Sequence, residues 1–165
     1  MFYAGYGSNL NKRQMEKRCP DSGKVASKLL KGWRLCFRGV ADIVPENGLS
    51  VNLGIYSISK KCEKALDFYE DFPSLYRKEY FKFDEFNEYV FTYVMNPGYG
   101  YGAPSKKYFD TIKQGYVDWG LDYGCLIEAA RESLLQPGDQ AYKSTRWSSR
   151  ETITEEYLKK LEEKQ

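Results

Sequence analysis

Short β-type runs separated by turn residues fill most of the first two-thirds of this chain, and they constrain its fold more than any other feature. The runs from Val40 to Val44 and from Leu49 to Ile58 flank Pro45-Glu46-Asn47-Gly48. An Asn-Gly pair between two such runs is a strong signal for a tight turn between antiparallel strands. We therefore predict a β-hairpin across this segment.

Further runs extend the predicted sheet. Residues 2–5 form an apolar strand, and residues 33–37 place apolar side chains at every second position, which is typical of a half-buried strand. The runs 76–83 and 89–95 are joined by a short polar stretch, residues 84–87. This spacing predicts a second antiparallel pair.

Helical patterns lie between and after these strands. Asn11 followed by Gln14 is a capping pair that begins a short polar helix ending near Arg18. Apolar residues at three- and four-residue spacing predict a helix over residues 60–70 and further helical stripes after residue 104. Strands with interspersed helices favour an α+β domain around a small curved or closed sheet.

The chain length suits one domain, which we place at residues 1–150. Thr152 and Glu155 have the spacing of a capping box, and they begin a charged helical tail over residues 151–165 that is expected to pack loosely. Lys and Arg number 25 against 23 Asp and Glu, which is too balanced to indicate a nucleic-acid partner. No apolar run approaches a membrane span, so we expect a soluble cytoplasmic protein.

The chain has no histidine, which excludes Ser-His-Asp and Cys-His machinery. A proton-transfer site would need a carboxylate with a raised pKa, a lysine with a lowered pKa, a tyrosine or a cysteine. The four cysteines, Cys19, Cys36, Cys62 and Cys125, form no C-x-x-C pair. We expect four reduced, partly buried thiols and no metal site.

Three groups of residues are candidates for chemistry. The loop Tyr3-Ala4-Gly5-Tyr6-Gly7-Ser8-Asn9-Leu10 has two glycines before a helix start, which suits either an anion site or an ordinary tight turn. Asp67, Glu70 and Asp71 lie at a helix end among aromatic residues that would raise a carboxylate pKa, although a solvated acidic end is the alternative. Most of the fifteen tyrosines are expected in the core, and a few in a pocket.

The ordered set of these motifs resembles the gamma-glutamylcyclotransferase family, including its gamma-glutamylamine cyclotransferase and AIG2-like branches. The resemblance runs from Tyr3 to about Leu135. The motifs that support it are Tyr6-Gly7-Ser8-Asn9-Leu10, Leu66-Asp67-x-x-Glu70, Tyr76, Tyr93, and Pro104-Ser105-x-x-Tyr108 with Gly115. Asp71 departs from the pattern, because the family commonly has glycine after the glutamate, but Asp tolerates a left-handed backbone.

The resemblance implies a small mixed β-barrel with flanking helices and a cofactor-independent enzyme that releases 5-oxoproline from a small gamma-glutamyl amide. Glu70 falls on the family's catalytic acid/base. The implied substrate-binding residues are Tyr3, Ala4, Gly5, Tyr6, Gly7, Ser8, Asn9, Tyr76, Tyr93 and Tyr108. A non-catalytic binding module on the same fold is the alternative. The amine half of the substrate and the oligomeric state are not set by the sequence.

Overall fold

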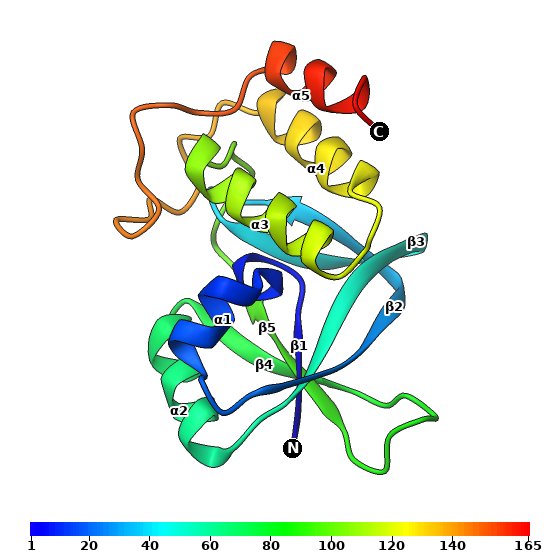
Figure 1. Cartoon of the computed structure of the whole chain (residues 1–165). Coiled ribbons are helices and arrows are strands. Elements are labelled where there is room, and N and C mark those ends of the chain that lie inside the picture. The colour runs from blue at the N-terminus through cyan, green and yellow to red at the C-terminus, as the bar shows by residue number, and fades with distance from the viewer.

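The computed structural model describes all 165 residues and combines one five-stranded sheet with five α-helices (Figure 1). The strands are β1 (Phe2–Gly5), β2 (Gly23–Phe37), β3 (Ala41–Ser57), β4 (Tyr76–Phe81) and β5 (Val90–Met95). The helices are the 3-10 turn η1 (Ser8–Leu10), then α1 (Lys12–Arg18), α2 (Lys60–Tyr69), α3 (Lys106–Asp118), α4 (Gly124–Leu134) and α5 (Glu155–Glu162).

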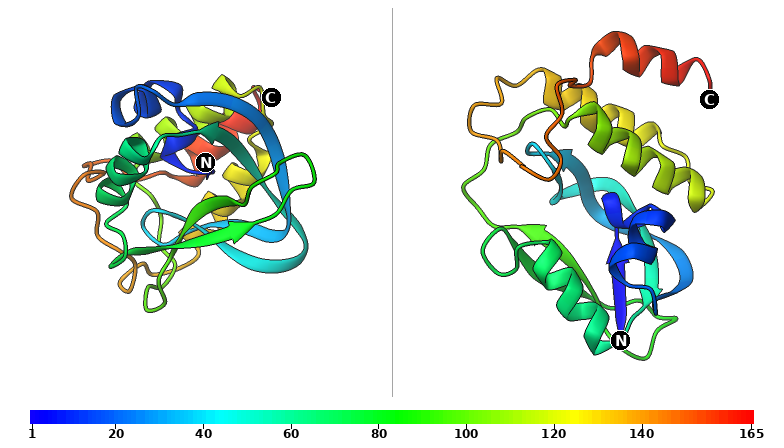
Figure 2. Two further views of the ribbon diagram at one scale, coloured as in Figure 1. Left: turned by 90° about the horizontal axis from the view of Figure 1, so that it is seen from below. Right: turned by 60° about the vertical axis from the view of Figure 1, so that its left-hand side comes forward.

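The sheet is mixed and open. Its strand order is β2-β3-β1-β5-β4, in which only β1 and β5 run parallel. The long β2–β3 pair curls strongly, as both views in Figure 2 show. No ladder joins the edge strands β2 and β4, so the sheet is curved but does not close into the barrel that the resemblance implied.

The predicted hairpin over residues 40–58 is wrong. β3 runs unbroken from Ala41 to Ser57 and pairs antiparallel with β2. The chain reverses earlier, at Gly39, whose φ of 85° supplies the left-handed conformation that a tight turn needs. Gly48 also has a φ of 85°, but it lies in an exposed bulge where the register passes from Lys31↔Ser50 to Trp33↔Pro45.

The other predicted strands are confirmed with shifted ends. The period-two run over residues 33–37 is the last part of β2, which begins ten residues earlier, at Gly23. The runs 76–83 and 89–95 form the antiparallel pair β4–β5, with Lys78 opposite Tyr93. This register matters for the site, because it brings Lys78 beside α2.

The predicted helices are also confirmed, with one corrected cap. Asn11 caps α1 by accepting a hydrogen bond from the Gln14 N–H. The helix predicted over residues 60–70 is α2, and Glu70 is its C-cap. The tail helix begins after Thr154, not Thr152, because the Thr154 hydroxyl accepts from the Tyr157 N–H.

The tail helix packs against the rest of the molecule. Leu158 is fully buried and Leu161 is nearly so. Arg131 on α4 forms ion pairs with Glu155 and Glu162 on α5. No helix of the chain is both long and apolar enough to span a membrane.

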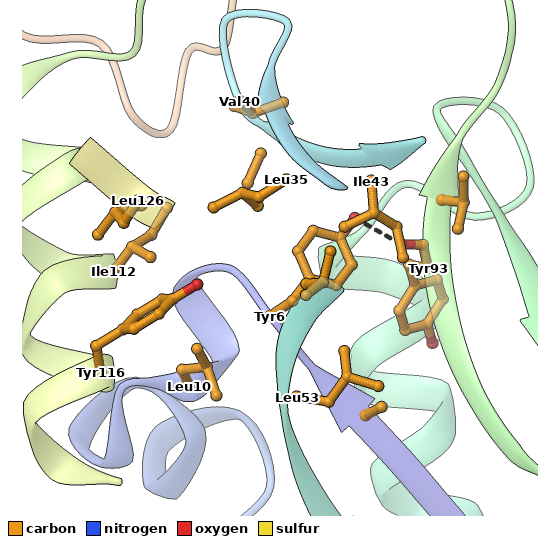
Figure 3. Packing of buried hydrophobic residues seen from close by; sticks show 14 of the residues in the cluster. Tyr6, Leu10, Leu35, Val40, Ile43, Leu53, Tyr93, Ile112, Tyr116 and Leu126 are labelled. Atoms are coloured by element: carbon orange, nitrogen blue, oxygen red, sulfur yellow. Dashed lines mark hydrogen bonds between the residues drawn. The ribbon is translucent and has the colours of Figure 1, made fainter. Parts of the chain in front are cut away.

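The core lies between the curled sheet and the helices α3 and α4 (Figure 3). Ile112 and Tyr116 from α3 face Leu10 and the sheet residue Leu53, and all four are fully buried. Helix α1 lies against the loop after β1 on the side away from α4, and α2 lies next to α1 (Figure 1). The loop after β1 therefore lies between the two groups of helices.

The expectation of four reduced thiols is wrong for one pair. Cys19 and Cys62 form a disulfide that joins the C-cap of α1 to the first turn of α2, while Cys36 and Cys125 are free. The two partners are 43 residues apart in the chain and lack the spacing of any short cysteine motif. Only the fold brings them together.

Candidate active site

One pocket of about 440 Å³ opens where the loop after β1 meets the end of α2. Nine of the eleven predicted site residues line it: Tyr3, Tyr6, Gly7, Ser8, Asn9, Glu70, Tyr76, Tyr93 and Tyr108. The other two, Ala4 and Gly5, belong to β1 and are not part of the wall. The pocket therefore gathers residues that are far apart in the sequence.

The loop after β1 is held from outside the pocket. The Tyr56 hydroxyl donates to the Asn9 carbonyl at 2.8 Å, and the Trp119 indole N–H donates to the Leu10 carbonyl at 2.9 Å. A Cβ on Gly115 would lie 2.6 Å from the Asn11 nitrogen, so glycine is required where α3 crosses the loop. These contacts fix the backbone of η1 against the pocket.

Glu70 enters the pocket because α2 ends there. Asp71 adopts a left-handed φ of 51°, which turns the chain sharply after Glu70. The Glu70 Oε1 accepts a hydrogen bond of 2.8 Å from the Asn9 side-chain amide. No protein group donates to Oε2, so this oxygen is available to a substrate.

The Asn9 amide links Glu70 to a cation. Its nitrogen donates to Glu70 and to the Tyr3 hydroxyl, at 2.8 and 2.7 Å, and its oxygen accepts from Arg18 at 2.5 Å. With both ends engaged, the amide has one possible orientation. Arg18 and Glu70 therefore bind opposite ends of one amide, and Arg18 forms no direct ion pair with the carboxylate.

Burial raises the pKa of Glu70 to about 7, against the opposing effects of Arg18, Asn9 and Arg146. The surrounding tyrosines do little to solvate the carboxylate. The hydroxyl of Tyr6 donates to the Tyr93 carbonyl, that of Tyr76 to the Ala41 carbonyl, and that of Tyr93 to Asp67. A carboxylate in such surroundings is poised to exchange a proton near neutral pH.

The three predicted carboxylates have different environments, although all of them line the pocket. Asp67 is paired with Lys78 at 2.8 Å and accepts from the Tyr93 hydroxyl at 2.6 Å. Asp71 is exposed to solvent and makes no ion pair. Glu70 alone combines a raised pKa with a free oxygen, which fits proton transfer.

Tyr69, Arg146 and Trp147 also line the pocket, although the sequence analysis did not predict them as site residues. The Tyr69 hydroxyl contacts Ser8 at 3.1 Å and accepts from the Trp147 indole at 2.9 Å. The guanidinium carbons of Arg18 and Arg146 lie 3.5 and 4.2 Å from the centre of the Tyr69 ring. Arg146 and Trp147 follow the last predicted helical stripe of the domain, in a stretch without periodicity, so no local pattern indicated them.

No group of three or more cysteine or acidic side chains is arranged to hold a metal ion. The two free cysteines also lie outside the pocket wall. Burial raises the pKa of the Cys36 thiol to about 12, so it is not ionised near neutral pH. Among the pocket residues, the side chains that could exchange a proton are therefore carboxylates and tyrosines.

Comparisons with known proteins find similarity to one family profile and to solved structures. The sequence profile of the family described as "Gamma-glutamyl cyclotransferase, AIG2-like" matches residues 3–119. A solved structure titled "Gamma-glutamyl cyclotransferase" superposes with a TM-score of 0.67 at 20% identity, over 99% of this chain and 98% of its own. An uncharacterized protein from Homo sapiens gives 0.67 at 22% identity, over 97% and 96%.

These structural likenesses show a shared fold, and they confirm the predicted α+β class. No curated protein sequence matches the chain. The profile match ends at Trp119, so it includes the loop after β1, Glu70, Tyr76, Tyr93 and Tyr108 but not the segment that holds Arg146.

Proposed function

Because the chain belongs to the gamma-glutamyl cyclotransferase, AIG2-like family, we propose that it cleaves small gamma-glutamyl amides and releases 5-oxoproline and a free amine. The observation that carries this proposal is the Glu70 carboxylate, which has one held oxygen, one free oxygen and a pKa of about 7 in a pocket wall. Such a group suits a reaction that removes a proton and then returns it.

In this reaction the substrate supplies its own nucleophile. The α-amine of the glutamyl part attacks the γ-carbonyl, a new C–N bond closes the lactam ring, and the bond to the leaving nitrogen breaks. A pocket that folds the glutamyl chain provides the entropic part of the acceleration. Neither a cofactor nor a protein nucleophile enters this scheme.

Glu70 is the proposed proton carrier. The α-amine is mostly protonated at neutral pH, so it cannot attack until it loses a proton. The free Oε2 takes that proton, and the same carboxyl then gives it to the departing nitrogen. The ring nitrogen releases its second proton to solvent as the tetrahedral intermediate collapses, which leaves the lactam N–H. The Asn9 and Arg18 contacts keep Oε1 in place during both steps.

The loop after β1 is the proposed site for an anionic group of the substrate. Gly7 lines the pocket, and its N–H donates to no acceptor within the protein. A side chain there would crowd Ala41, whose Cβ would lie 3.3 Å from an added Cβ. Backbone N–H groups in this position would hold either the α-carboxylate or the developing oxyanion.

Product analysis tests the proposal. A panel of gamma-glutamyl amino acids and gamma-glutamyl amines is incubated with the protein, and 5-oxoproline is measured by mass spectrometry. We expect product from at least one member and its loss in Glu70→Gln, which keeps the shape and the Asn9 contact but cannot carry the proton. No product from any member would favour a non-catalytic binding module, and full activity of Glu70→Gln would refute the role of Glu70.

A further inference from the structure

The segment from Tyr142 to Trp147, between α4 and α5, forms one wall of the pocket. Figure 2 shows the chain leaving the end of α4 in a long excursion before it returns to α5. The segment is anchored at both ends. The Tyr142 N–H donates to the Arg38 carbonyl at 2.9 Å, and the Trp147 carbonyl accepts from the Ser105 hydroxyl at 2.6 Å.

Arg146 is the one basic side chain in the pocket wall. It is held in place by Tyr69, because it donates to the Tyr69 carbonyl at 2.7 Å and stacks on the ring at 4.2 Å. Arg18 lies over the same ring at 3.5 Å, so the Tyr69 ring contacts two guanidinium groups. The guanidinium of Arg146 is thus oriented before any ligand arrives.

No carboxylate lies within ion-pair distance of Arg146, and one of its five N–H groups has a protein acceptor. The remaining donors suit a carboxylate, which a guanidinium binds through two parallel hydrogen bonds. Of the three acids in the pocket wall, Asp67 is neutralised by Lys78, Asp71 is exposed and makes no ion pair, and Glu70 takes part in the proposed reaction. The wall therefore has one fixed cation without an anionic partner.

The leaving half of the substrate must come close to this cation. Under the proposed function, the leaving nitrogen lies next to Glu70, and Arg146 contacts the carbonyl of the preceding residue. When the leaving half is an amino acid, its α-carboxylate is attached one carbon away from that nitrogen. Such a carboxylate would be repelled by Glu70 unless a cation compensated for the repulsion.

From this geometry, and resting on the proposed function, we propose that Arg146 is a specificity-determining residue that binds the carboxylate of the leaving half. The favoured substrates are then gamma-glutamyl amino acids, and gamma-glutamyl amines without a carboxylate are poor substrates. The determinant belongs to a segment outside residues 3–119, which the family profile matches. Members with the same Glu70 site and another segment here would select a different amine.

The test compares two substrates that differ by one carboxylate, gamma-glutamyl-alanine and gamma-glutamyl-ethylamine. We expect a kcat/KM ratio well above one in the native protein, and a fall of roughly ten- to hundredfold in that ratio for Arg146→Gln. Arg146→Lys keeps the charge but not the paired hydrogen bonds, so its ratio should be intermediate. Arg150→Gln removes an exposed charge four residues further on, outside the pocket wall, and should leave the ratio unchanged.

The outcomes separate this inference from the proposed function. 5-Oxoproline from neither substrate would count against the function itself. If the native protein forms product from both substrates with a kcat/KM ratio near one, the role of Arg146 is overturned and the proposed function stands. This outcome needs only the native protein, so it does not depend on whether Arg146→Gln folds. An equal loss with both substrates in a folded Arg146→Gln would overturn it too, because a general structural role predicts that result.

Discussion

Glu70 and Asn9 form the smallest unit on which the proposed chemistry depends. Asn9 is almost fully buried, and all of its side-chain donors and acceptors are engaged by Tyr3, Glu70 and Arg18. A buried amide with every partner satisfied is rigid, and removing one partner leaves the others unpaired at a cost of about 1–3 kcal/mol. The position of the Glu70 carboxylate is thus determined by the loop after β1 as much as by its own helix.

The pH dependence of turnover should report Glu70. Its pKa of about 7 predicts that kcat/KM rises as the carboxyl loses its proton and levels off above that pH. Arg18 lowers this pKa, so Arg18→Gln should move the acid limb of the profile to higher pH. The measurement is kcat/KM against pH for both proteins. An acid limb near pH 4, typical of a solvated carboxyl, would contradict the assignment.

The same raised pKa makes Glu70 costly for stability. Its pKa is 4.5 for an unperturbed group and about 7 in the fold, so the folded state binds the proton more tightly than the unfolded state does. The stability associated with this group is present below about pH 4.5 and is lost as the pH rises through about 7. The difference corresponds to at most about 3 kcal/mol.

Glu70→Gln should therefore be more stable than the native protein at pH 8, by up to about 3 kcal/mol, and about equally stable at pH 4. Urea unfolding at the two pH values measures the difference. An advantage of equal size at both pH values would show that ionisation of Glu70 is not its cause.

At the scale of elements, α1 and α2 each bring part of the site, and the Cys19–Cys62 disulfide joins them. Arg18 is the last residue of α1, directly before Cys19, and Glu70 ends the helix that holds Cys62. The bond closes a loop across 43 positions, which is expected to stabilise the fold by roughly 2–4 kcal/mol. It stabilises the side of the molecule that carries Glu70.

A reductant should consequently lower the urea midpoint of the native protein. The Cys19→Ser, Cys62→Ser double variant should start lower and show no response to dithiothreitol. Urea unfolding with and without dithiothreitol measures both effects. A native midpoint that is unaffected by reduction would show that the bond does not form in solution.

The elements also show what local sequence can and cannot predict. The predictions of the Asn11 cap and of the apolar stripe of α2 were correct. Capping and helical periodicity depend on residues that lie within about one helical turn of each other. The Asn47-Gly48 pair led to the wrong prediction of a hairpin, because a left-handed glycine occurs both in a chain reversal and in a β-bulge. Only the pairing of β3 with β2 along its whole length separates the two cases, and that is tertiary information.

At the scale of the whole molecule, the pocket wall combines the loop after β1, the end of α2, β5, the start of α3 and the segment before α5. Motifs indicated the first four, because they contain glycine, carboxylate and tyrosine at characteristic positions. Nothing in the sequence of Tyr142 to Trp147 indicates a pocket. Its role follows from its anchors on Arg38 and Ser105, which are distant in the chain.

We further propose that residues 151–165 belong to the same core as the rest of the chain. Leu158 is fully buried, whereas Leu135 is 80% exposed. Leu158→Ala should cost about 2–5 kcal/mol in unfolding free energy, and the same change at Leu135 should cost almost nothing. Urea unfolding of the two variants compares them. Equal small effects would show that the tail is a separate appendage.

The position of Trp147 in the wall has a consequence for synthesis. A translating ribosome releases Tyr3 and Glu70 early, but Trp147 only after α1, α2, α3 and α4 have been made. Until then the nascent chain lacks the residues that complete the pocket wall around Glu70. An mRNA truncated after α4 would encode a chain that contains every recognisable family motif but lacks one wall of the pocket.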